Sequence, residues 1–546
     1  MMRPMLSLTL ISLILATGCD SRQAARDVAV SGEDSADSAA ARMPISESTP
    51  PPRMGMAGEL MPLDPEGRGP GEGGDRYDRI VENPFYRVLE EPLSTFSIDV
   101  DTASYSKVRM FLNEANQLPP ADAVRIEELI NYFTYDYEPP ADEHPFAAHV
   151  EVAQCPWRNQ HQLVRIGIKG KEIDLDERPS SNLVFLLDVS GSMNQPNKLP
   201  LLKSGMKMLV DQLGENDSVA IVVYASASGL VLDSTSCDNK QEILDALSRL
   251  HAGGSTNGGD GIRLAYQVAL DNFIPGGINR VLLCTDGDFN VGTTSSGDLV
   301  RLAEENANSN IFLSVLAFGM GNHNDSMLEQ ISNKGNGNYA FIDTEKEAKK
   351  VLVEQMSGTL LTIAKDVKIQ VEFNPAAVQA YRLIGYENRI LEHQDFSDDT
   401  KDAGEIGAGH TVTALYEVIP VGVESDEVLP QVDPLKYQQP QALDPEAVGD
   451  ELLTLKLRYK QPDGAESTLM TIPVANSDQS IGAASPDFKQ AAAVAMFGML
   501  LRDSQQKGNS TYDAVLEIAG DAGRDSGDSY REEFLEMVER AKELAE

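Results

Sequence analysis

Three oxygen-bearing side chains stand at two-residue spacing in the motif Asp188-Val-Ser190-Gly-Ser192. In an extended turn this spacing lets one carboxylate and two hydroxyls converge on a single point, and the intervening glycine permits a tight backbone. All three groups are hard oxygen donors, which are the ligands that Mg²⁺ and Mn²⁺ prefer. Five apolar residues, 183–187, precede the motif, so we expect one buried strand that places Asp188 at its carboxyl end.

Two further loops carry residues of the same chemistry. Thr256 lies in the glycine-rich stretch 251–260, which enters a predicted helix, and Asp286 follows an apolar strand predicted over 280–285. Strands and helices alternate over about 180–363, which predicts an α/β domain with a doubly wound, mainly parallel sheet. Ligands of such sheets bind at the carboxyl ends of the strands, so the three loops should meet at one edge.

The elements expected to build this sheet follow from the apolar periodicity of the chain. Besides the strand of 183–187, strands are predicted over 219–224, 230–232, 280–285, 311–318 and 339–342. Helices are predicted over 198–213, 240–250, 261–273, 298–308, 326–332 and, as one long helix, 345–361.

Together these pieces resemble the metal-ion-dependent adhesion site of von Willebrand factor type A domains, as seen in integrin inserted domains. The resemblance implies that Asp188, Ser190, Ser192 and Thr256 ligate a divalent ion, with Asp286 joining directly or through water. The implied ion is Mg²⁺, with Mn²⁺ or Ca²⁺ as alternatives. Because hydroxyls supply most direct ligands, such an ion keeps uncompensated charge and an open position. A glutamate or aspartate of a protein partner can fill it, so we expect a binding protein without catalytic residues.

Rival interpretations of these residues fail on their spacing. An EF-hand loop starting at Asp286 would need glycine at its sixth position and glutamate at its twelfth, where the chain has Val291 and Gly297. The glycine-rich loop lacks the Gly-Lys-Ser/Thr ending of a phosphate-binding loop. A nucleophile elbow would need glycine at position 188. A metal-dependent hydrolase stays as an alternative, but no histidine or glutamate is evident as its general base.

The remaining composition excludes other functions. The 85 acidic residues outnumber 45 lysines and arginines, and the resulting charge of −40 makes nucleic acid an improbable ligand. The seven histidines show no zinc-binding spacing, and no C-x-x-C motif occurs. A disulfide between Cys155 and Cys237 is conceivable in an oxidising compartment, and the sequence leaves it open.

The N-terminus has the features of an exported protein. Arg3 precedes an apolar run over 5–16 that suits a signal peptide and is too short to span a membrane. The following Ala16-Thr-Gly-Cys19 resembles the bacterial lipobox, which implies a signal peptide and lipobox over 1–19 and a lipid on Cys19. Residues 20–75 are rich in Ala, Ser, Asp, Pro and Gly, and we expect a disordered tether. The expected location is the bacterial cell envelope, anchored by lipid to the inner or outer membrane and facing the periplasm or the exterior.

Strand patterns flank the central domain on both sides. Strands are predicted over 146–152 and 162–168 and again after residue 364, so the α/β domain should be an insert in a β-rich sandwich, with C-terminal helices over 486–502 and 511–545. Four flanking stretches resemble the YfbK-type bacterial von Willebrand A proteins: 92–105, 122–132, 381–389 and 402–416. The resemblance implies a YfbK-like N-terminal domain (76–179), a von Willebrand factor type A domain (180–363) and a YfbK-like C-terminal domain (364–546).

These observations favour a lipid-anchored envelope protein that captures an acidic residue of a protein partner through a divalent ion. A scaffold or assembly factor for an envelope complex is the first alternative, and the metal-dependent hydrolase is the second. The partner and the biological process are not encoded in any motif.

Overall fold

The computed structural model describes residues 75–173, 178–256, 258–287, 295–321, 323–355, 358, 360–425, 427, 429, 443, 447, 449–462, 464–523 and 527–546. The predicted signal peptide with Cys19 lies outside these residues, as does the predicted tether up to residue 74. No helix in the described part of the chain combines the length and apolarity needed to cross a membrane.

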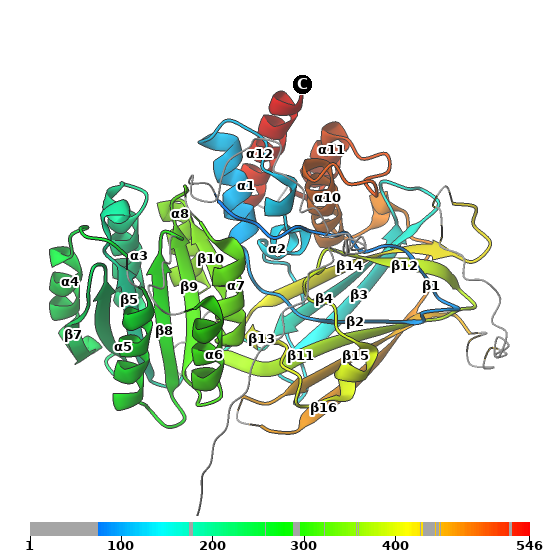
Figure 1. Cartoon of the computed structure of the whole chain (residues 1–546). Coiled ribbons are helices and arrows are strands. Elements are labelled where there is room, and N and C mark those ends of the chain that lie inside the picture. Colours follow the sequence, from blue (N-terminus) through cyan, green and yellow to red (C-terminus); the bar gives the residue numbers. More distant parts are fainter. Residues whose placement is uncertain are drawn as a thin grey trace, which may run out of the picture. The chain divides into compact units, whose positions relative to one another are not determined.

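The central α/β unit is built on a six-stranded sheet with the order β10-β9-β8-β5-β6-β7 (Figure 1). All neighbouring strands are parallel except β6 and β7, which are antiparallel. The doubly wound, mainly parallel sheet is therefore confirmed. Its strands are β5 (Ser181–Asp188), β6 (Ser218–Tyr224), β7 (Ser228–Ser236), β8 (Ile278–Thr285), β9 (Phe312–Phe318) and β10 (Tyr339–Ile342).

Helices cover both faces of this sheet, which explains the continuous apolar run of β5. Leu183, Phe185 and Leu187 pack on one side and Val184 and Leu186 on the other. A strand buried on both faces needs no polar alternation. The first face packs against α3 (Leu199–Gln212), α4 (Lys240–Arg249) and α8 (Glu345–Lys349). The second packs against α5 (Gly258–Asp271), α6 (Ser296–Ala307) and α7 (Asp325–Lys334).

The single long helix predicted over 345–361 is wrong. Helix α8 ends at Lys349 and is followed by a π-helix, Lys350–Glu354. The Gln355 N–H donates to the Lys350 carbonyl at 2.8 Å, which is the five-residue step of a π-turn. A uniform 3.6-residue period does not reveal this change of hydrogen bonding.

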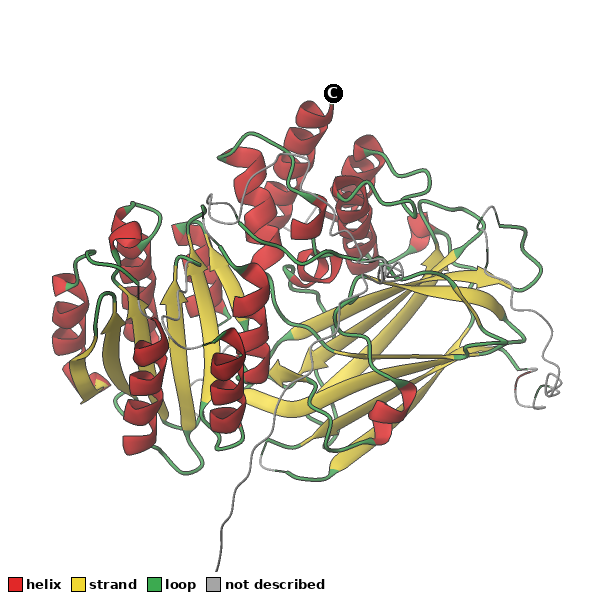
Figure 2. Ribbon diagram, in the orientation of Figure 1, coloured by secondary structure: helices red, strands yellow, loops and turns green. Residues whose placement is uncertain are grey.

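A β-sandwich is assembled from strands on both sides of the insert (Figures 1 and 2). Strand β4 pairs antiparallel with β14, and β2 pairs antiparallel with β11, so the predicted inserted topology is confirmed. The apolar faces of the two sheets form one core. The first sheet consists of β1 (Tyr86–Arg87), β12 (Val378–Ile384), β14 (Thr411–Pro420), β4 (Gln162–Gly170) and β3 (Phe146–Gln154). The second consists of β13 (Gly404–Gly407), β11 (Thr362–Phe373), β15 (Glu451–Lys460), β16 (Ser467–Ala475) and β2 (Leu93–Ser97).

Helices from the two ends of the described chain share another core. A 3₁₀ turn, Ala121–Ala123, comes shortly before the short helix α2. Apolar side chains of the N-terminal and C-terminal helices pack together, and α10 is buried as a core helix. The participating helices are α1 (Ala103–Asn113), α2 (Ile126–Asn131), α10 (Pro486–Leu501), α11 (Tyr512–Gly523) and α12 (Ser529–Ala545).

A buried polar cluster lies around the lone tryptophan. Trp157 is fully buried, and its Nε1 donates to Glu417 Oε2 at 3.0 Å. Arg382 Nη2 donates to the same carboxylate at 2.8 Å, and His161 Nδ1 lies 2.6 Å from its other oxygen. Trp157 is therefore a core residue. The cysteines Cys155, Cys237 and Cys284 are buried free thiols, so the disulfide left open by the sequence does not form.

Candidate metal centre

Asp188 is positioned by the central strand of the sheet. It is the last residue of β5 and is fully buried. Its Oδ1 accepts a hydrogen bond from the Ser190 N–H at 2.8 Å, whereas Oδ2 is buried and has no hydrogen-bond partner among the described residues. Burial raises the pKa of Asp188 to about 6, although the Ser190 hydrogen bonds oppose this. A carboxylate held in this way destabilises the protein unless a cation compensates it.

The two serines of the motif come together beside this carboxylate. Ser190 Oγ and Ser192 Oγ lie 2.9 Å apart, with Ser190 buried and Ser192 exposed. Ser190 directly precedes a 3₁₀ turn, Gly191–Asn194, which turns the backbone between the two side chains. The first loop thus brings one carboxylate and two hydroxyls to the carboxyl end of β5, as predicted.

Backbone hydrogen bonds join the second loop to the first. The Gly191 N–H donates to the Gly254 carbonyl at 2.9 Å, and the Gly253 N–H donates to the Val189 carbonyl at 2.8 Å. Gly254 has a φ of +87°, which only glycine adopts without strain. Thr256, two residues further on, is half-buried just before α5. The chain therefore brings Thr256 to the same sheet edge as the serines.

Asp286 enters from the neighbouring strand. It follows β8, which pairs in parallel with β5, and its negative charge is one of the causes that raise the pKa of Asp188. Its Oδ2 accepts a hydrogen bond from Lys198 Nζ at 2.9 Å, and both side chains are buried. Sequence reasoning missed Lys198, which stands directly before α3. No local pattern indicated its role, because Lys198 and Asp286 are 88 residues apart in the sequence.

The loop after β8, which carries Asp286, packs against the loop after β9, and Asp75 at the start of the described chain holds that second loop. The Asp75 carboxylate accepts from the Gly321 N–H at 3.1 Å and from the His323 N–H at 3.0 Å. His323 in turn contacts Gly287, where an added Cβ would lie 2.0 Å from its Nδ1. The Asn324 N–H also donates to the Gly287 carbonyl. The backbone after Asp286 is therefore fixed by close packing.

The donor set fits a divalent ion of the Mg²⁺ type. It offers two carboxylates and three hydroxyls, and one buried carboxylate oxygen, Asp188 Oδ2, has no hydrogen bond within the described residues. Mg²⁺ binds through one or two carboxylates together with neutral oxygen ligands. The role of the five residues as metal ligands stays a prediction.

A second acidic cluster is explained by an arginine. Carboxylate oxygens of Asp99, Asp101 and Glu329 lie within 4.8 Å of one another, and all three residues are buried. Arg389 lies among them, with Nη2 at 3.1 Å from Asp99, 3.3 Å from Asp101 and 3.6 Å from Glu329. Arg125 Nη2 also lies 2.6 Å from Glu329, so two guanidinium groups pair with this cluster, which links α7 to the flanking domain.

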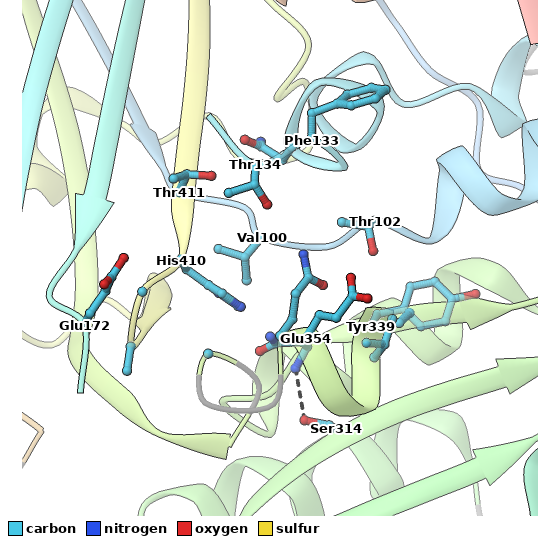
Figure 3. A pocket seen from close by; sticks show the side chains of 18 of the residues that line it. Val100, Thr102, Phe133, Thr134, Glu172, Ser314, Tyr339, Glu354, His410 and Thr411 are labelled. Carbon is cyan, nitrogen blue, oxygen red and sulfur yellow. Dashed lines mark hydrogen bonds between the residues drawn. The ribbon is translucent and has the colours of Figure 1, made fainter. Parts of the chain in front are cut away.

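A cavity of about 440 Å³ lies apart from the candidate centre (Figure 3). It is lined by Ser314 of β9, Tyr339 of β10 and His410 before β14, and the His410 ring points into it. Burial and nearby cations lower the pKa of His410 to about 4, so the ring is neutral at pH 7. None of the five predicted ligands lines this cavity.

Family models match three parts of the chain. Residues 182–355 match the model described as von Willebrand factor type A domain, which covers every element of the candidate centre. Residues 358–544 match the model described as Uncharacterized protein YfbK, C-terminal, and residues 72–165 match the model described as von Willebrand factor.

Whole-chain comparisons agree with these matches. The chain is 44% identical over 476 residues to "Uncharacterized protein YfbK" of Escherichia coli (strain K12), covering 86% of this chain and 81% of that protein. It is 28% identical over 326 residues to "Uncharacterized protein sll0103" of Synechocystis, covering 58% of this chain and 70% of that protein. Among solved structures, von Willebrand factor type A from Catenulispora acidiphila covers 74% of this chain and 91% of its own, at 18% identity and a TM-score of 0.39.

Proposed function

Because the chain belongs to the YfbK family of von Willebrand factor type A proteins, we propose that it is a binding protein and not an enzyme. Its central domain captures an acidic residue of a protein partner through a divalent ion, Mg²⁺ in the first instance. The supporting observation is the state of Asp188, whose Oδ2 is buried and has no hydrogen-bond partner in the described part of the chain. The hydroxyls of Ser190 and Ser192 also support a metal centre, since they lie 2.9 Å apart in the same loop.

The residues of the centre have separate roles in this proposal. Asp188, Ser190, Ser192 and Thr256 would hold the ion, and Asp286 would join directly or through water. The Ser190 N–H fixes the Asp188 carboxylate through Oδ1, which leaves Oδ2 for the ion. When bound, the ion supplies a positive charge that attracts a carboxylate. Hydroxyl ligands do not neutralise that charge, so a partner's Asp or Glu gains more than it would from a site of carboxylates alone.

We also propose that the protein is held at the cell envelope by a lipid on Cys19. The motif Ala16-Thr-Gly-Cys19 supports this, together with the apolar run before it. Residues 20–75 would then act as a tether, and a flexible chain of that length reaches on the order of 40 Å. Such a tether would let the central domain meet partners beyond the lipid surface.

Titration calorimetry tests the metal centre first. We expect wild type to bind Mg²⁺ and Asp188→Ala to lose that binding, with near-ultraviolet circular dichroism showing an unchanged fold. The matched control is Asp245→Ala on α4, which removes an exposed aspartate that accepts a hydrogen bond from Gln241 of its own helix. Equal Mg²⁺ affinity in wild type and Asp188→Ala would contradict the proposal.

Affinity capture from envelope extract tests the partner. Proteins held by wild type in Mg²⁺, and lost in EDTA or with Asp188→Ala, are the expected result. Mg²⁺ binding without any metal-dependent partner would favour the scaffold alternative, in which the ion only stabilises the loops.

A further inference from the structure

Lys198 enters the candidate metal centre as a buried cation. Its Nζ donates to Asp286 Oδ2 at 2.9 Å, and its side chain is only 6% exposed. The lysine stem passes Gly319, where an added Cβ would lie 2.4 Å from Lys198 Cε. Gly319 also has a φ of +68°, a conformation that a larger residue adopts only with strain. The loop after β9 is therefore shaped to admit this lysine.

The lysine changes the charge that the centre presents to an ion. Asp188 and Asp286 contribute two negative charges, and Lys198 contributes one positive charge, so the protein part carries −1. A divalent ion added to this set leaves a net charge of +1. Without the lysine the same two carboxylates would neutralise the ion fully. Buried charges interact strongly because the protein interior screens them less than water does.

We propose that Lys198 is a built-in countercharge that keeps the metal centre electrophilic, lowering its affinity for the ion while raising the ion's affinity for a carboxylate. This inference rests on the proposed function and names a residue that tunes it. By holding one oxygen of Asp286, Lys198 limits how far that carboxylate can act as a metal ligand. The partner's carboxylate then meets an ion whose charge is only half compensated.

Loss of Lys198 should change the affinity for the metal ion and the affinity for a carboxylate in opposite directions. Removing the positive charge should tighten metal binding and weaken carboxylate binding in the same protein. A lysine that only stabilises the loops would behave differently, because its loss would weaken both. From the Coulomb energy of charges a few ångströms apart, we expect about tenfold tighter metal binding and at least about threefold weaker carboxylate binding.

The experiment uses the full chain with Mn²⁺ as the metal probe and acetate as the carboxylate probe. Free Mn²⁺ is measured by electron paramagnetic resonance, and acetate is titrated onto the Mn²⁺-loaded protein while water proton relaxation is followed. The variants are Lys198→Met and, as a polar replacement should the first not fold, Lys198→Gln. The matched control is Lys240→Met, which removes a lysine that donates to the Asp211 carbonyl at the surface.

Tighter Mn²⁺ binding together with weaker acetate binding supports the proposal. Mn²⁺ affinity that stays equal or falls in a folded Lys198 variant overturns it, even where wild type binds the metal as the proposed function requires. If neither wild type nor variant binds Mn²⁺, the proposed function fails and this inference fails with it. Mn²⁺ binding in the variant alone would also overturn the proposal, because a lysine that excludes the ion from wild type cannot tune carboxylate capture there.

Discussion

Substitution of Glu417 by glutamine tests whether the charge cluster around the tryptophan stabilises the sandwich. Glu417 lies on β14 and is fully buried. Burial by itself raises the pKa of this carboxyl, but His161, Arg382 and Arg158 together bring the pKa down to about 2. Glutamine keeps the shape of the side chain and removes its charge, so two arginines are left without their buried partner.

The expected loss of folding stability in Glu417→Gln follows from the lowered pKa of Glu417. A shift from the ordinary value of about 4.5 to about 2 corresponds to about 3 kcal/mol of stability at pH 7. Removing one partner of a buried ion pair costs about 3–5 kcal/mol in general, which agrees. Because the folded-state pKa lies below the unfolded-state value, this stability is complete above about pH 5. It is lost as the pH falls through the interval from about 4.5 to 2.

Urea unfolding followed by far-ultraviolet circular dichroism measures the effect. We expect the free energy of unfolding of Glu417→Gln to lie about 3 kcal/mol below wild type at pH 7, and the gap to shrink by about 1 kcal/mol at pH 3.5. The control is Glu372→Gln, which removes an exposed ion pair with Lys456 and should cost less than about 1 kcal/mol. A gap below about 1 kcal/mol at pH 7, or one that widens in acid, would refute the reasoning.

Three further predictions concern other parts of the molecule. Burial raises the pKa of Glu329 to about 7, so wild type loses up to about 1.4 kcal/mol of stability per pH unit as the pH rises from about 4.5 to 7. In urea unfolding, Glu329→Gln should therefore lose less free energy of unfolding than wild type over this pH interval. The same pH dependence in both proteins would count against the prediction. Gly319→Ala should lower the melting temperature more than Gly276→Ala, because both glycines have a φ near +70° but only the first contacts Lys198; equal losses would mean that backbone strain alone acts. Burial raises the pKa of the Cys237 thiol to about 11, so we expect alkylation followed by mass spectrometry to modify it, and the other buried thiols at 155 and 284, only after unfolding; rapid labelling of the native protein would be the contrary result.

The sequence predicted best those parts of the site whose residues lie close together in the chain. Asp188, Ser190 and Ser192 lie within five residues, and a buried strand must deliver them to its end. Asp286 followed from the rule that parallel strands end at one edge, which the parallel pairing of β8 with β5 confirms. Thr256 lies in the loop between α4 and α5, and the glycine-rich stretch around it was its signal.

Long-range ion pairs were beyond this reasoning. Lys198 is 88 residues from Asp286, and Arg389 is 290 residues from Asp99. No local pattern says which of 45 basic residues meets which of 85 acidic ones. The π-helix after α8 was missed for a related reason. Its first residue, Lys350, contacts the ring of Tyr132, which lies 218 residues earlier in the sequence, and apolar spacing does not indicate such a contact.

The inserted topology sets an order for folding. Strand β4 must find β14 across the whole α/β insert, and an unfolded insert would make this a very long loop to close. A folded insert shortens it, because its two connections lie together: a Cβ on Gly170 would be 3.0 Å from Ile363. During synthesis on the ribosome, the whole α/β insert is made before β11–β16, so the sandwich can close only afterwards. Until β11–β16 are made, β3 and β4 lack the strands that cover their apolar side chains, and apolar surface exposed in this way promotes aggregation.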